Sequence, residues 1–297
     1  MIKAHGKSLR RQAFERWLRN KPAVISGAFI LIICCLGVLA PWVAPYPFDE
    51  QHLEAVLAPP SHAHWLGADS LGRDMLSRLI FGARISMAVG LITASVSLII
   101  GTIYGALAGW FGGYVDSVMM RVVDILDSIP SIILLILVKL IFDALNLISH
   151  PELKSLMGML LALSLVSWVS LARVVRGQVL LVKQLAYVEA ARGLGASSLR
   201  IVVQHILPNI AGPVIVLLTF QIPSNILSES FLSFLGLGLQ PPYASWGVLA
   251  NDGWRSMTSY PHLIISPGMA IFVTMLAFNI LGDGLRDAFD PQMRGRD

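Results

Sequence analysis

The stretch ISMAVGLITASVSLIIGTIYGALAGWFGGYV, residues 85–115, decides the fold of this chain, because it contains no Asp, Glu, Lys or Arg. An α-helix needs about 20 predominantly apolar residues to cross the hydrocarbon core of a bilayer. The stretch is longer than that, and a soluble core helix of such length would show polar residues on one face. We therefore predict a transmembrane helix here.

Five further apolar runs extend this prediction to the rest of the chain. They cover residues 22–48, 128–145, 155–172, 209–239 and 256–282. The chain as a whole is 55% hydrophobic, with a mean hydropathy of +0.70 and 13% charged residues, against about 25% charged in soluble domains. This composition excludes a soluble enzyme. The predicted fold class is all-α, a polytopic membrane protein with six transmembrane helices.

The positions of lysine and arginine predict the orientation of these helices. Six spans place both termini on the same side. With the termini inside the cell, 16 Lys and Arg residues fall on the inner side and 6 on the outer side. Cytoplasmic segments carry the excess of positive charge in membrane proteins. We therefore expect both termini to be cytoplasmic.

The spans divide the chain into four parts. Residues 1–21 form a cytoplasmic N-terminal segment, and residues 22–84 form the first transmembrane helix with a long outer loop. Residues 85–285 form a five-helix core, and residues 286–297 form a cytoplasmic tail. The core includes a long inner loop, residues 173–208, which is cytoplasmic in this orientation.

The inner loop has the pattern of two short helices around a glycine hinge. Leu181, Leu185 and Val188 share one helical face, and Gly193 and Gly195 interrupt the helix. Ser197 or Ser198 is placed to cap the second helix. An apolar stripe at i, i+3, i+4 and i+7 follows, which predicts a buried face: Leu199, Val202, Val203 and Ile206. An amphipathic helix lying on the membrane surface is the alternative interpretation.

The same loop resembles the EAA loop of importer permeases of the ATP-binding cassette (ABC) class. The match consists of Glu189-Ala190-Ala191, Gly195 after three residues, and then Leu207-Pro208. His205 departs from the pattern, which has an isoleucine two residues before the leucine. Ile206 is placed to supply that apolar contact instead.

Five more blocks carry the resemblance over most of the chain. They are WLGADSLGRDMLSRLIFGARIS at 65–86, VSWVSLARVVRGQ at 166–178, SESFLSFLGLG at 228–238, SWG at 245–247 and GDGLRDAFDP at 282–291. Together they are most similar to the C-type membrane subunit of bacterial oligopeptide permeases. Dipeptide and nickel permeases are near relatives, and their substrates remain alternatives.

The resemblance implies a role for the inner loop. In this family the EAA loop docks in a cleft of a cytoplasmic ATPase, so it must be compact and must protrude. Ala190, Ala191 and Gly195 permit close backbone approach, and Glu189 offers a charge to the cleft. At the hinge we expect Gly195 to adopt a positive φ. Leu207-Pro208 closes the motif, with the proline setting how the chain returns to the membrane.

The resemblance also implies partners. They are a sister permease subunit in a heterodimer, one or two ABC ATPase subunits, an extracytoplasmic solute-binding protein and the lipid of the bacterial inner membrane. The chain has no GxxxxGK[ST] phosphate loop, so ATP and magnesium are expected in the partner ATPases. We expect no cofactor, metal site, catalytic residue or nucleic-acid partner in this chain.

Glu229 is the ionisable residue of most interest within an apolar span. Such residues often face a substrate pathway, and contact with the amino terminus or backbone of a peptide is one interpretation. The other interpretation is a structural role, in which Glu229 pairs with polar groups of a neighbouring helix.

Two other classes of function compete with an ABC permease. A self-sufficient secondary transporter should show repeated halves, and the two halves of this sequence do not resemble each other. An intramembrane hydrolase should show a motif such as HExxH or GxSxG. Neither motif occurs.

Overall fold

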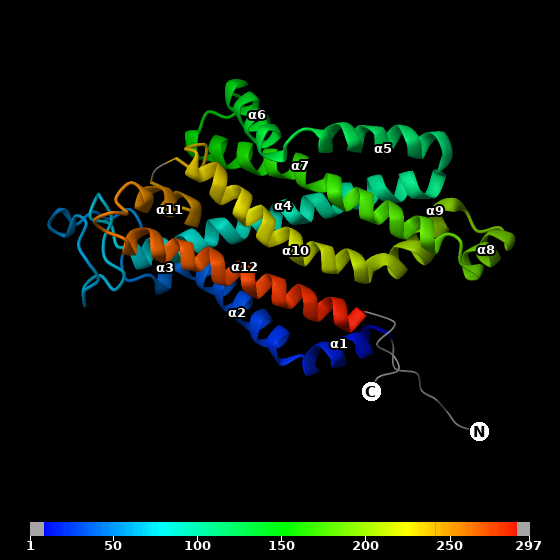
Figure 1. Ribbon diagram of the computed structural model, residues 1–297, viewed down its shortest axis with the longest axis horizontal. Helices are drawn as coiled ribbons and strands as arrows, with labels where there is room; N and C mark the ends of the chain where they lie inside the picture. The colour runs from blue at the N-terminus through cyan, green and yellow to red at the C-terminus, as the bar shows by residue number, and fades with distance from the viewer. Residues whose placement is uncertain (1–8, 241, 290–297) are drawn as a thin grey trace.

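The computed structural model of the chain describes residues 9–240 and 242–289. Over those residues the chain is helical, and its extended pairing is limited to one isolated bridge between Ala68 and Asp74. The long helices run along the long axis of an elongated bundle (Figure 1). The predicted all-α membrane fold is confirmed.

Five helices are long and apolar enough to cross a membrane. They are α2 (Lys21–Val38), α4 (Met75–Phe111), α7 (Pro151–Val182), α10 (Leu207–Phe234) and α12 (His262–Phe289). The shorter elements are α1 (Leu9–Arg19), α3 (Ala40–Val43), a 3-10 turn (Leu53–Ala55), α8 (Ala186–Gly193), α9 (Ser198–Ile201), a π-helix (Val202–Ile206) and α11 (Trp246–Trp254).

The third predicted span along the chain is broken. Its two parts, α5 (Gly113–Ser128) and α6 (Ser131–Ala144), meet at an angle of 92°. Pro130 lies in the break, and a proline disfavours the helical conformation in the residue before it. Ile129 is accordingly extended, with φ −90° and ψ 130°. The predicted run 128–145 coincides with α6, which has 14 residues, and six spans result only when the bent pair of α5 and α6 is counted as one.

Several predicted boundaries also move. Residues 75–84, placed in the outer loop, belong to α4, and residues 173–182, placed in the inner loop, belong to α7. The predicted tail boundary at 285 falls inside α12. The helices extend past the ends of the uncharged runs because their backbone hydrogen bonding continues through these residues.

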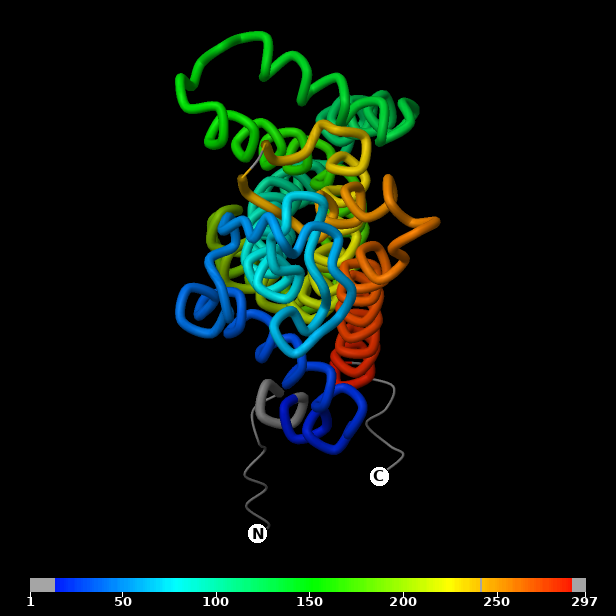
Figure 2. Tube along the Cα trace, turned by 90° about the vertical axis from the view of Figure 1, so that its left-hand side faces the viewer, coloured from blue at the N-terminus to red at the C-terminus, as the bar shows by residue number. Residues whose placement is uncertain are grey.

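Close packing of α4 on α7 forms the centre of the bundle. Gly101, Gly105 and Gly109 recur every four residues on one face of α4 and let the two backbones approach. A Cβ atom on Gly101 would lie 2.9 Å from Leu171 Cβ, and one on Gly109 would lie 2.9 Å from Val179 Cβ. Seen down the long axis, α2 and α12 lie on one side of α4, and α5 and α6 lie on the other (Figure 2).

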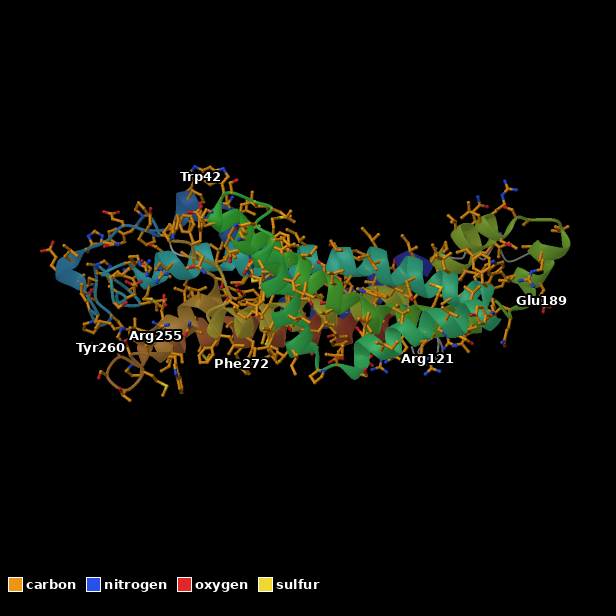
Figure 3. The ribbon with its side chains drawn as sticks, turned by 90° about the horizontal axis from the view of Figure 1, so that it is seen from above. Trp42, Arg121, Glu189, Arg255, Tyr260 and Phe272 are labelled. Atoms are coloured by element: carbon orange, nitrogen blue, oxygen red, sulfur yellow. The ribbon has the colours of Figure 1, made fainter. Side chains whose placement is uncertain are left out.

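The two ends of the bundle are formed by different elements. The loop before α4 gathers with α11 at one end, and α8 protrudes at the other (Figure 1). Arg255 and Tyr260 lie far from Glu189 along the long axis (Figure 3). The start of α1 and the end of α12 both lie toward the end that carries α8 (Figure 1). This arrangement agrees with six crossings, while the direction of insertion stays a prediction.

Buried ion pairs order the end that carries α11. The Asp69 carboxylate accepts a hydrogen bond from Arg73 Nε at 2.7 Å and pairs with Arg78, which also lies 3.5 Å from Asp252 of α11. Asp74 caps α4 by accepting from the Ser77 N–H. Its other oxygen lies 3.0 Å from Nδ1 of a buried His64. The long loop is thereby fixed to both α4 and α11.

Candidate functional site

The inner loop forms a compact turn at the protruding end of the bundle. Its helix α8 carries Glu189, Ala190 and Ala191 and ends in a Schellman motif. The Ala196 N–H donates to Ala191 O at 3.1 Å, and the Gly195 N–H donates to Arg192 O at 3.0 Å. These bonds satisfy carbonyls at the helix end that would otherwise lack partners.

Gly195 adopts the positive φ expected at the hinge, +82°. Only glycine adopts this conformation at no steric cost. A Cβ atom built at Gly195 meets no atom within 4 Å. Within this chain, therefore, backbone conformation alone requires the glycine, and any steric requirement would have to come from another molecule.

The second short helix begins at the predicted cap. The Ser197 side chain accepts from the Arg200 N–H at 3.4 Å, and α9 then continues through the π-helix into α10. Pro208 has no N–H to donate to the preceding turn. The turn widens there, with the Leu207 N–H donating to Val202 O. Asn209 Nδ2 donates to His205 O at 2.6 Å, which satisfies another carbonyl of this turn.

Apolar contacts connect the inner loop to the long helices. Val188 and Ile206 are fully buried, and Ile201 is nearly so. They form one cluster with Val175 and Val179 of α7, against which Ala191 and Leu207 also pack. Val188 thus packs α8 into the same close-packed cluster as α7.

The predicted apolar faces of the loop are partly wrong. Leu199 is 75% exposed and Val203 is also exposed, whereas Ile201 and Ile206 are buried. Leu181 and Leu185 are likewise exposed, unlike Val188. The widened π-turn shifts the helical period, so a stripe counted at 3.6 residues per turn selects the wrong side chains.

Two cations hold the loop against the end of α4. Lys183 Nζ donates to Gly109 O at 2.7 Å, in the last turn of α4. A cation there interacts favourably with the negative end of the helix dipole. The guanidinium of Arg192 lies 5.2 Å from the ring centroid of Trp110, a cation–π contact. The sequence motif gave no indication of either contact.

The tip of the loop presents a mixed surface. Glu189 and Ala190 are both exposed, and Glu189 lies at one end of the molecule (Figure 3). Leu194 is 89% exposed beside the hinge. Partial burial raises the pKa of the Tyr187 hydroxyl, so it remains a neutral hydrogen-bonding group at physiological pH.

Glu229 lies away from the loop, near the opposite end of α10, and is fully buried. Its carboxylate accepts hydrogen bonds from serine hydroxyls at 2.6 to 3.5 Å: Ser86, Ser230, Ser233 and Ser245. These serines belong to α4, to α10 and to the cap of α11. In this arrangement Glu229 holds three elements together, which agrees with the second of its two interpretations.

Ion pairs between α5 and α7 form a further polar group that the sequence did not predict. Arg176 makes a two-pronged contact with Asp116, at 2.5 and 2.6 Å. Arg173 pairs with Asp124 at 3.2 Å and Asp127 at 2.8 Å. The described residues contain no group of three or more His, Cys, Asp or Glu placed to hold a metal ion.

Comparisons with known proteins match nearly the whole chain. Residues 101–295 match the family described as the binding-protein-dependent transport system inner membrane component. Residues 8–60 match the N-terminal transmembrane domain of oligopeptide transport permease C.

Individual relatives match with similar strength. The dipeptide transport system permease protein DppC of Bacillus subtilis is 41% identical over 294 residues, which cover 99% of this chain and 89% of the relative. The oligopeptide transport system permease protein OppC of the same organism is 40% identical, covering 97% and 91%. The glutathione transport system permease protein GsiD of Pectobacterium atrosepticum is 41% identical, covering 96% and 91%.

The fold also has a solved counterpart. A chain in the inward-facing MetNI methionine ABC transporter superposes with a TM-score of 0.58 at 18% identity. The match covers 73% of this chain and 98% of the other. At this identity the likeness concerns the fold alone.

Proposed function

Because this chain belongs to the family of binding-protein-dependent transport system inner membrane components, and is thus a membrane-spanning permease subunit of a bacterial ABC importer, we propose that it imports oligopeptides. The relatives are named for dipeptide, oligopeptide and glutathione transport, and each of these substrates is a peptide. They support the peptide class, and the oligopeptide choice rests on the sequence blocks most similar to C-type subunits. Dipeptides and nickel chelates are the alternatives within the family.

The inner loop is the proposed contact with the ATPase. The observation that carries this proposal is a rigid turn whose underside, Val188, Ile201 and Ile206, is buried against α7 while Glu189 and Leu194 stay exposed. A turn packed in this way would keep its shape when the ATPases move against it. Closure of the ATPases would then move α7 and α10 as rigid bodies.

Partners supply what this chain lacks. Permeases of this family work with ATPase and solute-binding-protein subunits, and the family's membrane subunit is not itself catalytic. We place ATP and magnesium in the ATPases. We also place a sister permease beside this chain in a heterodimer, so that each chain lines half of one pathway. The charge bias of 16 to 6 supports a cytoplasmic position for both termini and the inner loop.

Reconstitution of the complete importer tests the function. The chain, its sister permease, the ATPases and the solute-binding protein are placed in proteoliposomes, and uptake of a labelled pentapeptide, a dipeptide and Ni²⁺ is measured. We expect ATP-dependent uptake of the pentapeptide. Uptake of Ni²⁺ alone would reject the peptide assignment, and uptake by this chain without the ATPases would favour a secondary transporter.

A further inference from the structure

A neutral polar stripe runs along facing sides of α10 and α7. On α10 its members are spaced at i, i+3, i+4 and i+7, which places them on one helical face. On α7 the two members are three residues apart. We define the polar stripe as Gln221, Ser224, Asn225, Ser228, Ser167 and Ser170.

The polar stripe lies at the middle of both helices. Gln221 is 14 residues from the start of α10 and 13 from its end. Ser167 is 16 residues from the start of α7 and 15 from its end. With a rise of about 1.5 Å per residue, both positions are roughly 20 Å or more from either helix end. Gln221 thus lies well inside the predicted run 209–239, whereas Ser167 and Ser170 lie toward the inner end of the predicted run 155–172. Polar groups within a membrane-spanning run are costly to expose to lipid.

Hydrogen bonds join the two helices along the stripe but leave groups free. Ser167 Oγ donates to Asn225 Oδ1 at 2.9 Å, and Gln221 Nε2 donates to Ser167 O at 2.6 Å. Asn225 is 3% exposed, yet its Nδ2 has no partner among the described residues. Ser224 and Ser170 are both exposed. A buried amide donor without a partner costs free energy unless something else accepts from it.

Large apolar side chains are exposed elsewhere on the span helices. Ile215 on α10 is 41% exposed and Phe272 on α12 is 58% exposed, and Phe272 points outward from the bundle (Figure 3). Side chains of this kind suit contact with lipid. The carboxamides of Gln221 and Asn225 suit contact with water or with another protein surface better than contact with lipid.

We propose that the polar stripe is one wall of the translocation pathway and that it hydrogen-bonds the main-chain amides of the transported peptide. This inference rests on the proposed function. Carboxamides and hydroxyls both donate and accept hydrogen bonds, as the peptide main chain does. The stripe contains no charged side chain, so it pairs with any peptide regardless of its side-chain charges. A site for a nickel chelate would instead require ligating or charged groups.

Cysteine labelling in the assembled importer tests the location. Cys34 and Cys35 are replaced by Ala, and Ser224→Cys is compared with Ile215→Cys, a similarly exposed position on the same helix. We expect a charged, membrane-impermeant thiol reagent to modify Ser224→Cys in at least one nucleotide state and excess peptide to slow that modification at least threefold. Ile215→Cys should remain unmodified. Absence of modification at Ser224→Cys in every state would overturn the proposal.

Transport kinetics test the chemistry. In the reconstituted importer, Gln221→Ala and Ser224→Ala should each raise the KM for peptide uptake by about three- to tenfold, as expected for losing one neutral hydrogen bond. The same factor should appear with acidic, basic and neutral peptides. An unchanged KM together with weakened binding of the sister permease would assign the stripe to the heterodimer interface and overturn the proposal. Absence of peptide uptake by the unmodified importer would instead reject the proposed function.

Discussion

Replacing Gly195 separates the conformational role of the hinge from its contact with another protein. Three variants are needed. Gly195→Leu adds a side chain at φ +82°, and Gly195→Asn adds a side chain of similar length that tolerates the left-handed region. Gly193→Leu is the matched control, because Gly193 ends α8 and also has open space around its Cβ position.

The free-energy cost of Gly195→Leu follows from the structure. No atom lies within 4 Å of a Cβ at Gly195, so Leu meets no steric clash within the chain. The remaining cost is the left-handed conformation, about 1–2 kcal/mol for a residue with a side chain. This cost is small against a typical stability of about 5–15 kcal/mol, so insertion and folding should survive. It is nevertheless enough to shift a local equilibrium of the turn by about 5- to 30-fold.

The assay is the number of peptides imported per ATP hydrolysed in proteoliposomes. We expect Gly195→Leu to lower this ratio strongly while Gly193→Leu leaves it near the unmodified value. If Gly195→Asn also lowers the ratio, the added side chain collides with the ATPase; if it does not, the conformation of the turn is what matters. An unmodified ratio for Gly195→Leu with normal ATPase attachment would refute the coupling role of the inner loop.

Three further predictions test the topology, the rigidity of the loop and the location of the energy source. In intact cells, with Cys34 and Cys35 replaced by Ala, an impermeant thiol reagent should label His62→Cys but not Ser197→Cys; labelling of the latter from outside would reverse the topology. Val188→Ala should reduce the free energy of unfolding by about 2 kcal/mol because it leaves a cavity under α8, whereas Leu199→Ala, at an exposed position, should leave thermal stability unchanged and weaken ATPase binding. The isolated chain should bind no ATP by calorimetry, and measurable binding would contradict the assignment of ATP to the partners.

Features that depend on near neighbours in the chain could be predicted from the sequence. The membrane spans follow from long uncharged runs, because only a helix satisfies its backbone hydrogen bonds in lipid. The hinge at Gly195 and the cap at Ser197 follow from local backbone preferences and side-chain reach. Each of these features is decided by residues within a few positions of one another. The EAA pattern could likewise locate the candidate site, because its residues lie close together in the sequence.

Features that depend on which elements meet in space could not be predicted. Arg121 and Asp124 are spaced to pair on one helix, yet Asp124 pairs with Arg173 of α7. Both arrangements are compatible with the sequence, and the packing of α5 on α7 selects between them. The sequence around Glu229 was likewise compatible with a role in the pathway or with contact to a neighbouring helix. In the structure, serines of α4 and of the α11 cap donate hydrogen bonds to its carboxylate.

The amino-acid sequence by itself thus determined that this chain spans a membrane, roughly where it does so, and which loop carries the coupling motif. Only the tertiary structure decided that the third predicted span bends by 92°, that Ile201 rather than Leu199 is buried, and that a polar stripe joins α7 to α10. The physical reason is that hydropathy and periodicity measure what a segment can bury. What it does bury depends on side chains that are distant in sequence and become neighbours only on folding.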